Sequence, residues 1–593
     1  MLFPRSLVFS LAFCLKAIAA QPNIVFIITD DQGYGDLACH GNTVIKTPHL
    51  DKLHSESIRL TDYHVSPTCT PTRAALMTGR FTNRTGAWHT IMGRSLLRTN
   101  ESTIADHLSK AGYHTAIFGK WHLGDSYPYQ PQYRGFKKTY IHGGGGVGQT
   151  PDLWDNSYFD DTYSEDGKLV QAKGFCTDVF FEEATEFIEE RVKASEPFFA
   201  YISTNAPHGP YNAPQEYLDM YPELEGKTQS FFAMITNIDD NVGKLRDKIA
   251  ELGAAENTLF IFTTDNGTAG GAKVFNAKMR GNKGSNLDGG HRVPFFLHWP
   301  AQGWSKGRDV GTLSAHVDIL PTFADLCDFS LEGGLPVDGV SLLPLLEEKK
   351  GEWPDRILVT DSQRNVTPQK WKNCSIMKQG WRLINGKQLY NIDKDPAQKK
   401  NLAKEHPERV KEMRQGYEDW WASMKDSFSQ GAPFHLGDNP APFSLTAHDL
   451  IGNGGTRSVA WNQQHIREGK LTGIHEGEPA YWLIKVTKAG EYSFELSRYP
   501  LYTGLALNAS APVGEQVPGY SQSFRTYPAK AFDIKSASIL LNGKEIASAP
   551  VDPSKPSVTL KVTLPEGEHR LSALFETANG PNVAYYLEET PAQ

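Results

Sequence analysis

A short segment around one cysteine carries the most reactive combination of residues in the sequence. Residues 69–73 read Cys-Thr-Pro-Thr-Arg and lead into an Ala-Ala-Leu-Met run. This run and Pro71 predict a helix that begins at Cys69, because proline is favoured in the first turn of a helix. The free N–H groups at such a helix N-terminus stabilise negative charge. The alternative is a buried structural cysteine, which is the usual fate of an unpaired thiol.

Two pairs of oxygen donors lie far from this segment. Asp30 and Asp31 follow one apolar run, and Asp265 and Asn266 follow another. Together with residue 69 they suit Ca²⁺, which takes 6–8 oxygen ligands, with Mg²⁺ as the alternative. Zinc is disfavoured because the set offers no histidine. A lone Asp-Asp pair is usually a solvated turn, but a second donor pair after another strand favours a metal site.

The runs that precede these residues have the length of buried strands. Apolar segments occur at residues 24–28, 114–118, 198–202 and 259–262, as expected for strands of a parallel sheet covered on both faces. Helical periodicity appears at residues 180–194 and 231–252. The pattern predicts an α/β fold with a mixed, mostly parallel sheet sandwiched by helices.

Polar residues follow all four runs. Lys120 and His122 come after the second run, and His208 comes after the third. Ligands of open parallel sheets bind beyond the carboxyl ends of the strands. We therefore expect these side chains and the two oxygen-donor pairs to converge at one edge of the sheet. Four separate runs that end in polar residues indicate a functional site more strongly than any single motif.

The composition excludes several classes of protein. The chain has 593 residues, 60 Lys+Arg against 68 Asp+Glu, and 39% hydrophobic residues. This balance excludes a mainly disordered chain and gives no basic excess for nucleic-acid binding. Residues 1–20, with Arg5, an apolar core and small residues at the end, predict a signal peptide and hence a secreted or periplasmic protein. Beyond them, no stretch approaches the roughly 20 apolar residues of a transmembrane helix.

The rest of the chain divides by composition. We expect a large α/β domain at residues 21–350, a small α+β subdomain at 351–430 and an accessory β-sandwich domain at 431–593, which begins with a Gly/Pro-rich linker. An Asn-Gly turn at residues 542–543 predicts a hairpin. Five cysteines outside the signal segment are too few for a disulfide framework, and their pairing stays open.

The motifs in chain order resemble the type I, formylglycine-dependent sulfatases of the alkaline phosphatase superfamily. Besides the segments above, the resemblance rests on residues 119–124, 206–208, 280–283, 289–294 and 389–402, and it covers about residues 22–425. Asp288 and His291 depart from the glutamate and the apolar residue that are usual in the family. We expect this departure to affect local packing rather than chemistry.

The resemblance implies a mechanism. A maturation enzyme would oxidise Cys69 to formylglycine, whose hydrate is a geminal diol: one hydroxyl attacks sulfur, and the other then expels sulfate. Arg73 would hold the diol, Lys120 and Lys283 would neutralise sulfate oxygens, His122 would take the diol proton, and His208 would protonate the leaving alcohol. The implied metal ligands are Asp30, Asp31, residue 69, Asp265 and Asn266.

The substrate is less well defined by the sequence. The resemblance implies a sulfated saccharide, of the galactose or N-acetylgalactosamine type. His89 and Arg94, shortly after the helix that begins at Cys69, and His142, at the start of a glycine run, are candidate contacts by their position in the sequence. A run of glycines at residues 143–146 predicts either a flexible pocket mouth or a plain loop. The alternatives are a phosphonate monoester or phosphodiester hydrolase and a non-catalytic glycan-binding protein. A single metal with two lysines fits the one charge of a sulfate monoester better than the two of a phosphate monoester.

Overall fold

The computed structural model describes residues 21–349, 351, 353–440, 443–455, 459–520 and 524–590. The predicted signal peptide lies outside these residues. Within the described ranges, no helix has the length and apolar character needed to span a bilayer. The five described cysteines are free thiols, and all except Cys39 are buried.

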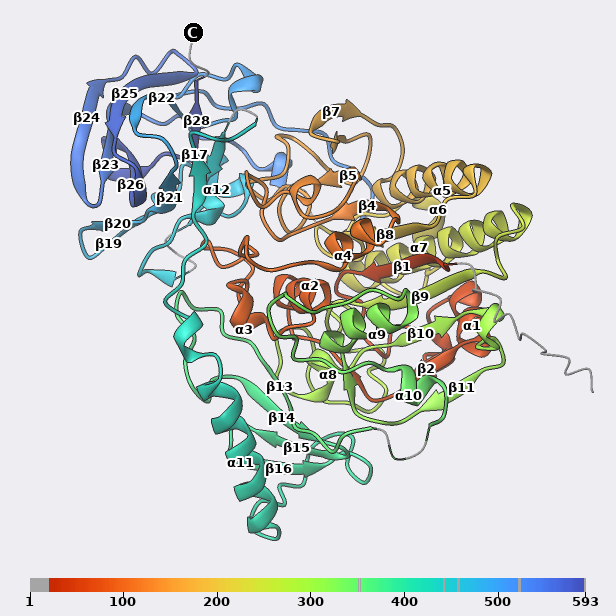
Figure 1. Cartoon of the computed structure of the whole chain (residues 1–593). Helices are drawn as coiled ribbons and strands as arrows, with labels where there is room; N and C mark the ends of the chain where they lie inside the picture. Colours follow the sequence, from red (N-terminus) through yellow and green to blue (C-terminus); the bar gives the residue numbers. More distant parts are fainter. Residues whose placement is uncertain are drawn as a thin grey trace, which may run out of the picture.

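A ten-stranded sheet forms the centre of the molecule (Figure 1). Its four middle strands, in the order β9-β1-β8-β4, are parallel to one another. This arrangement confirms the mixed, mostly parallel sheet predicted from the sequence. The middle strands are β1 (Asn23–Thr29), β4 (His114–Lys120), β8 (Phe198–Ser203) and β9 (Thr258–Thr264), and the outer ones are β2 (Ile58–Leu60), β5 (Lys138–His142), β6 (Thr162–Glu165), β7 (Lys168–Gln171), β10 (Phe295–His298) and β11 (Arg308–Val310).

Helices cover both faces of this sheet because its strands carry apolar side chains on both faces. Val25 and Ile27 of β1 belong to a core shared with α1 (Pro48–Glu56), α5 (Cys176–Ala194) and α7 (Gly226–Glu251). Ile24, Phe26 and Ile28 face the opposite core. That core is shared with α2 (Cys69–Thr78), α4 (Ile104–Lys110) and α9 (Ile319–Leu326). Both faces of β1 are therefore buried, as its unbroken apolar run predicts.

A smaller α+β unit lies beside the main sheet, drawn in teal in Figure 1. Its antiparallel sheet has the order β13-β14-β15-β16, and α11 packs against β14. The five residues of β14 show no alternation of polar and apolar side chains. The elements are β13 (Leu358–Asp361), β14 (Cys374–Lys378), β15 (Trp381–Ile384), β16 (Gln388–Asn391) and α11 (Pro407–Ala422).

The C-terminal part contains two larger β-sheets that share one core, drawn in blue in Figure 1, and a two-stranded sheet of β19 (Ile474–His475) and β20 (Glu478–Pro479). Asn542 and Gly543, with φ values of 53° and 82°, form the predicted hairpin turn. The stretch expected to be a linker contains β17 instead. One sheet contains β17 (Phe434–Leu436), β21 (Trp482–Val486), β26 (Gly567–Thr577), β23 (Ile534–Leu541) and β24 (Lys544–Pro550), with β27 (Gly580–Val583) beside β26; the other contains β18 (Ser444–Thr446), β28 (Tyr586–Glu589), β22 (Gly490–Ser497) and β25 (Ser557–Leu564).

This C-terminal core continues into the α/β part of the chain. Ile91, Met92, Leu96 and Tyr129 are buried in the same cluster as the β-sheet residues. The Tyr129 hydroxyl also donates a hydrogen bond of 2.6 Å to the carbonyl of Pro433. The C-terminal sheets are therefore packed against the α/β part rather than attached through an extended linker.

Candidate active site

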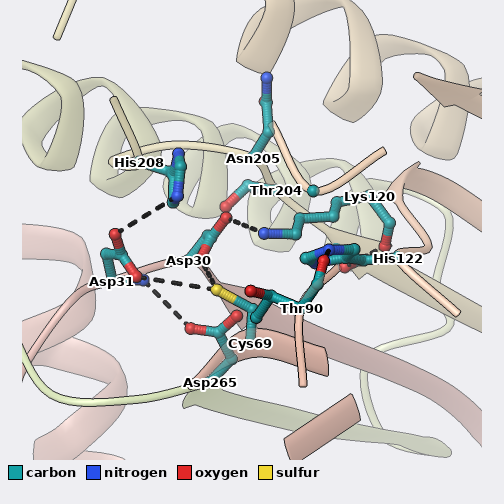
Figure 2. A network of polar contacts seen from close by, with 12 residues as sticks. Asp30, Asp31, Cys69, Thr90, Lys120, His122, Thr204, Asn205, His208 and Asp265 are labelled. Atoms are coloured by element: carbon teal, nitrogen blue, oxygen red, sulfur yellow. Dashed lines mark hydrogen bonds and ion pairs between the residues drawn. The ribbon is translucent and has the colours of Figure 1, made fainter. Parts of the chain in front are cut away.

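Four adjacent parallel strands end at one edge of the sheet and place polar residues there. Asp30 and Asp31 follow β1, Asp265 follows β9, Lys120 ends β4, and His208 lies in the loop after β8. Figure 2 shows these side chains converging around one sulfur atom. The convergence expected from the strand ends is thus present in the structure.

The sulfur belongs to Cys69, the first residue of α2, where the sequence predicts the helix to begin. Its thiol donates to Oδ1 of Asp30 at 3.2 Å and lies 3.9 Å from Oδ1 of Asp31. One ligand atom from each of Asp30, Asp31, Cys69 and Asp265 lies within 4.8 Å of the others, and all four residues are buried. Burial, together with the nearby Asp265 and Asp30 carboxylates, raises the pKa of the Cys69 thiol, so the unmodified side chain is a weak nucleophile.

The oxygen donors at this point fit a hard divalent cation. Asn266 donates from Nδ2 to Asp31 at 2.9 Å, and its Oδ1 is buried without a hydrogen-bond partner among the described residues. Burial and the carboxylate of Asp30 raise the pKa of Asp265 to about 6. Closely spaced buried carboxylates and an unsatisfied amide oxygen are the donors that Ca²⁺ takes. The four residues predicted as protein ligands, with residue 69, are brought together here.

Three cations surround the carboxylates. Lys283 Nζ lies 2.6 Å from Oδ1 of Asp31 and 3.6 Å from the sulfur of Cys69. Although burial alone would raise the pKa of Asp31, the ammonium of Lys283 and other partners lower it overall. Arg73 donates to Oδ2 of Asp265 at 2.8 and 3.2 Å.

Lys120 pairs with Asp30 and is fully buried. The three cations therefore match the three carboxylates in number. A bound divalent cation would leave the site positive overall, which favours an anionic ligand.

The two histidines have opposite ring nitrogens available. His122 donates from Nε2 to the carbonyl of Thr90 at 3.0 Å, so its Nδ1 is an acceptor, and it has no partner among the described residues. His208 donates from Nδ1 to the carbonyl of Gly209 at 2.7 Å, and its Nε2 lies 3.8 Å from Oδ2 of Asp31. Burial and the charge of Lys283 lower the pKa of His208 to about 3. Both tautomers follow from the carbonyl partners.

The glycine run packs directly against these two rings. A Cβ atom on Gly145 would lie 2.1 Å from Cε1 of His122, and one on Gly146 would lie 3.0 Å from Nδ1 of His208. Any side chain at Gly145 would displace the His122 ring. The sequence marked this run only as a loop or pocket mouth, because the steric reason depends on residues distant in the chain.

A cavity of about 890 Å³ opens over Asp31, His208 and Lys283. The three predicted substrate contacts do not line it. His89 and His142 are 1% and 2% exposed. Arg94 donates to the carbonyl of Val366 and lies over the ring of Trp88 at 5.0 Å.

Other residues, which the sequence analysis did not select, line the cavity instead. Two are cations, Lys227 and Arg364, and others are aromatic residues of the C-terminal part. Lys227 could have been found from the sequence, because it lies in the first turn of α7, where the helix dipole disfavours a positive charge. Arg364 lies in an irregular segment and carries no comparable signal.

The departure at Asp288 is accommodated by packing, as expected. Arg382 is fully buried and lies between two carboxylates, 3.0 Å from Asp288 and 2.5 Å from Asp62. His291 contacts His64 through their Nδ1 atoms at 2.9 Å. This cluster supports the fold beside the site without facing the cavity.

Comparisons with known proteins agree with this geometry. The Sulfatase family model matches residues 22–329. Human arylsulfatase A is 33% identical over 379 residues, which span 58% of this chain and 71% of that protein. Mouse N-acetylgalactosamine-6-sulfatase is 31% identical over 382 residues, 59% of this chain and 71% of that one. The crystal structure of Ps i-CgsB in complex with k-i-k-neocarrahexaose is 29% identical with a TM-score of 0.63, and the match covers 69% of this chain and 94% of that chain. The chain therefore belongs to the sulfatase family, the sulfuric ester hydrolases of the alkaline phosphatase superfamily.

Proposed function

We propose that this sulfatase hydrolyses sulfate esters on a saccharide, with residue 69 as the nucleophile after its oxidation to formylglycine. The observation that carries the proposal is the position of the Cys69 sulfur, within 4.8 Å of carboxylate oxygens from Asp30, Asp31 and Asp265. A formylglycine at this position supplies a geminal diol, which offers one hydroxyl for attack and a second for release of sulfate. The raised pKa of the thiol supports a need for this modification.

A divalent cation, Ca²⁺ in preference to Mg²⁺, completes the proposed site. Asp30, Asp31, Asp265 and Asn266 would hold it together with residue 69, as their oxygen-rich donor set suggests. Such an ion polarises sulfuryl oxygens and lowers the pKa of a bound hydroxyl. Arg73 orients Asp265 through its two hydrogen bonds, and its charge favours the ionised form of that carboxyl group.

The remaining side chains bind charge and move protons. Lys120 pairs with Asp30 and Lys283 lies beside the Cys69 sulfur, which supports a role for both in neutralising the sulfate oxygens, where charge develops in the transition state. The unpaired Nδ1 of His122 is the acceptor for the diol proton during release of sulfate. His208 is neutral in the free protein, and the negative charge of a bound ester favours its protonated form, which then donates from Nε2 to the leaving alcohol.

A sulfated sugar is the proposed substrate class. Relatives include an N-acetylgalactosamine-6-sulfatase, and a structural neighbour was solved with a neocarrahexaose. These names support a galactose-type or N-acetylgalactosamine-type sugar as the first candidates. We further propose that residues 1–20 direct the protein out of the cytoplasm and that a maturation enzyme modifies Cys69.

The test is a panel of sulfated mono- and oligosaccharides with 4-nitrophenyl sulfate and an aryl phosphonate monoester, assayed with metal-loaded enzyme whose residue 69 is confirmed as formylglycine. We expect sulfate release from at least one sulfated sugar and a higher kcat/KM on the aryl sulfate than on the phosphonate. A preference for the phosphonate would instead support the alternative hydrolase. Absence of turnover on every ester would support a glycan-binding role.

A further inference from the structure

The cavity over the active site has a second wall that comes from outside the family-like part of the chain. Trp461, Tyr520, Phe524 and Tyr527 line it together with Asp31 and Lys283. These aromatic residues lie well beyond residue 329, where the family match ends. We propose that the C-terminal β-domain, residues 431–593, forms a subsite for the sugars next to the sulfated one, and that two cations at this subsite bind a second anionic group of an oligosaccharide.

Backbone hydrogen bonds hold the aromatic wall against the loops of the α/β part. The carbonyl of Trp461 accepts from the N–H of Thr150 at 3.0 Å, and Gln463 donates to the carbonyl of Gly148. Phe524 packs on Gly148, where a Cβ atom would lie 2.8 Å from its Cδ2. Because these contacts fix the backbone on both sides, this part of the wall has a defined position relative to the active site.

A second set of contacts fixes the outer part of the wall. Tyr520 donates from its N–H to the carbonyl of Tyr211 at 2.9 Å, and Gly519 forms an antiparallel bridge with Asn212. Tyr211 lies three residues after His208 in the same loop. The loop that carries His208 is thus paired directly with the segment that carries Tyr520.

The aromatic side chains are arranged with accessible surfaces. Trp461 and Phe524 meet edge to face, with ring centroids 6.0 Å apart and planes at 89°, and Tyr520 is 57% exposed. An exposed aromatic ring in a cavity gives a flat apolar surface at low entropic cost. The C–H faces of a pyranose ring are apolar in the same way, so a sugar stacked there would be held with its hydroxyls toward water.

Two cations of the cavity have no acidic partner among the described residues. Lys227 lies over the ring of Tyr211 at 4.5 Å, and Arg364 is exposed. Among the described residues, neither forms an ion pair or a side-chain hydrogen bond. A lysine in the first turn of α7 is also disfavoured by the helix dipole. Binding of an anion at this point would offset both costs.

The size of the cavity agrees with a substrate larger than one sugar. About 890 Å³ lies near the upper end of the range of small-ligand sites. Its lining carries Lys283, which lies beside Cys69, and two further cations, Lys227 and Arg364. An oligosaccharide with one sulfate at the reacting position and a second sulfate or a carboxylate on another sugar matches this distribution.

This inference rests on the proposed sulfatase activity, so the experiment separates the two. Matured, metal-loaded wild-type enzyme and the variants Tyr520→Ala, Trp461→Ala and Arg364→Gln are assayed on 4-nitrophenyl sulfate and on sulfated oligosaccharides with one or two anionic groups. Two matched controls are Tyr133→Ala, an exposed tyrosine outside the cavity, and Lys544→Gln, an exposed lysine of the same β-domain. Thermal unfolding establishes that each variant is folded.

We expect all folded variants to keep kcat/KM on 4-nitrophenyl sulfate within about twofold. On the oligosaccharides, Tyr520→Ala and Trp461→Ala should lose about tenfold, mainly through KM. Arg364→Gln should lose about tenfold on the doubly anionic oligosaccharide and little on the singly anionic one. The controls should match wild type on every substrate.

Equal kcat/KM for wild type and all three variants on every oligosaccharide would overturn the subsite, while turnover of sulfate esters by wild type would leave the proposed function intact. A selective loss on oligosaccharides supports the subsite. If Trp461→Ala unfolds, Tyr520→Ala and Arg364→Gln decide the question, because both side chains are exposed. Failure of wild-type enzyme on every sulfate ester would overturn the proposed function and the subsite with it.

Discussion

Replacing Lys283 with methionine removes one charge from the reacting end of the site and keeps the side-chain length. Lys283 Nζ lies 3.6 Å from the sulfur of Cys69. At an effective dielectric constant of about 20, a unit positive charge at that distance stabilises a unit negative charge by roughly 4–5 kcal/mol. Loss of one preorganised donor to a developing charge typically costs about 10²–10³ in kcat. We therefore expect Lys283→Met to lower kcat on 4-nitrophenyl sulfate by about 10²–10³.

The assay needs two companion measurements, because Lys283 also pairs with Asp31. Bound metal is quantified by atomic emission, and formylglycine at residue 69 by peptide mass spectrometry. Lys283→Arg, which keeps the charge, should recover part of the lost rate, and Lys273→Met, which removes an exposed lysine of a nearby segment, should behave as wild type. A loss in kcat of less than about fivefold, with metal and formylglycine intact, would refute the charge role of Lys283.

Three further outcomes are expected. Gly145→Ala should lower kcat at least tenfold, because its Cβ would lie 2.1 Å from the His122 ring. The control Gly490→Ala, whose Cβ would have no atom within 4 Å, should keep the wild-type kcat. Equal kcat for Gly145→Ala and wild type would contradict the packing of Gly145 against His122. Removal of metal with a chelator should abolish turnover, and Ca²⁺ should restore it better than Zn²⁺; full activity after exhaustive chelation would exclude the metal. Burial raises the pKa of Asp36 to about 7, so the stability that this group contributes is present below pH 4 and is lost as pH rises through 7. Between pH 5 and 8, the denaturant concentration at the unfolding midpoint should thus fall more for wild type than for Asp36→Asn. An equal fall for the two proteins over this pH range would contradict this.

The site could be predicted because local sequence patterns determine where its strands end and where its helix begins. Asp30 and Asp265 each follow an apolar run of strand length, and parallel strands bring their carboxyl ends to one edge. Cys69 begins a helix for reasons local to residues 69–73. These elements needed no knowledge of long-range packing.

The substrate end of the cavity could not be predicted in this way. His89 and His142 were chosen by their proximity in sequence to motif residues, but both side chains are buried away from the cavity. Trp461 reaches the cavity through backbone pairing with a loop about 300 residues earlier. Contacts of that range follow from how whole domains pack, and no local pattern around Trp461 encodes them. The apparent linker failed as a prediction for the same reason, since β17 forms only by pairing with β21.

Whether residue 69 acts as a formylglycine nucleophile is decided by how sulfate release depends on the chemical state of this residue. Preparations with different formylglycine contents, obtained by varying the supply of maturation enzyme and measured by mass spectrometry of the residue-69 peptide, are assayed under saturating Ca²⁺. We expect specific activity to rise in proportion to the formylglycine fraction and to extrapolate to zero for the pure thiol. Undiminished activity in a preparation that retains only the cysteine thiol would contradict it.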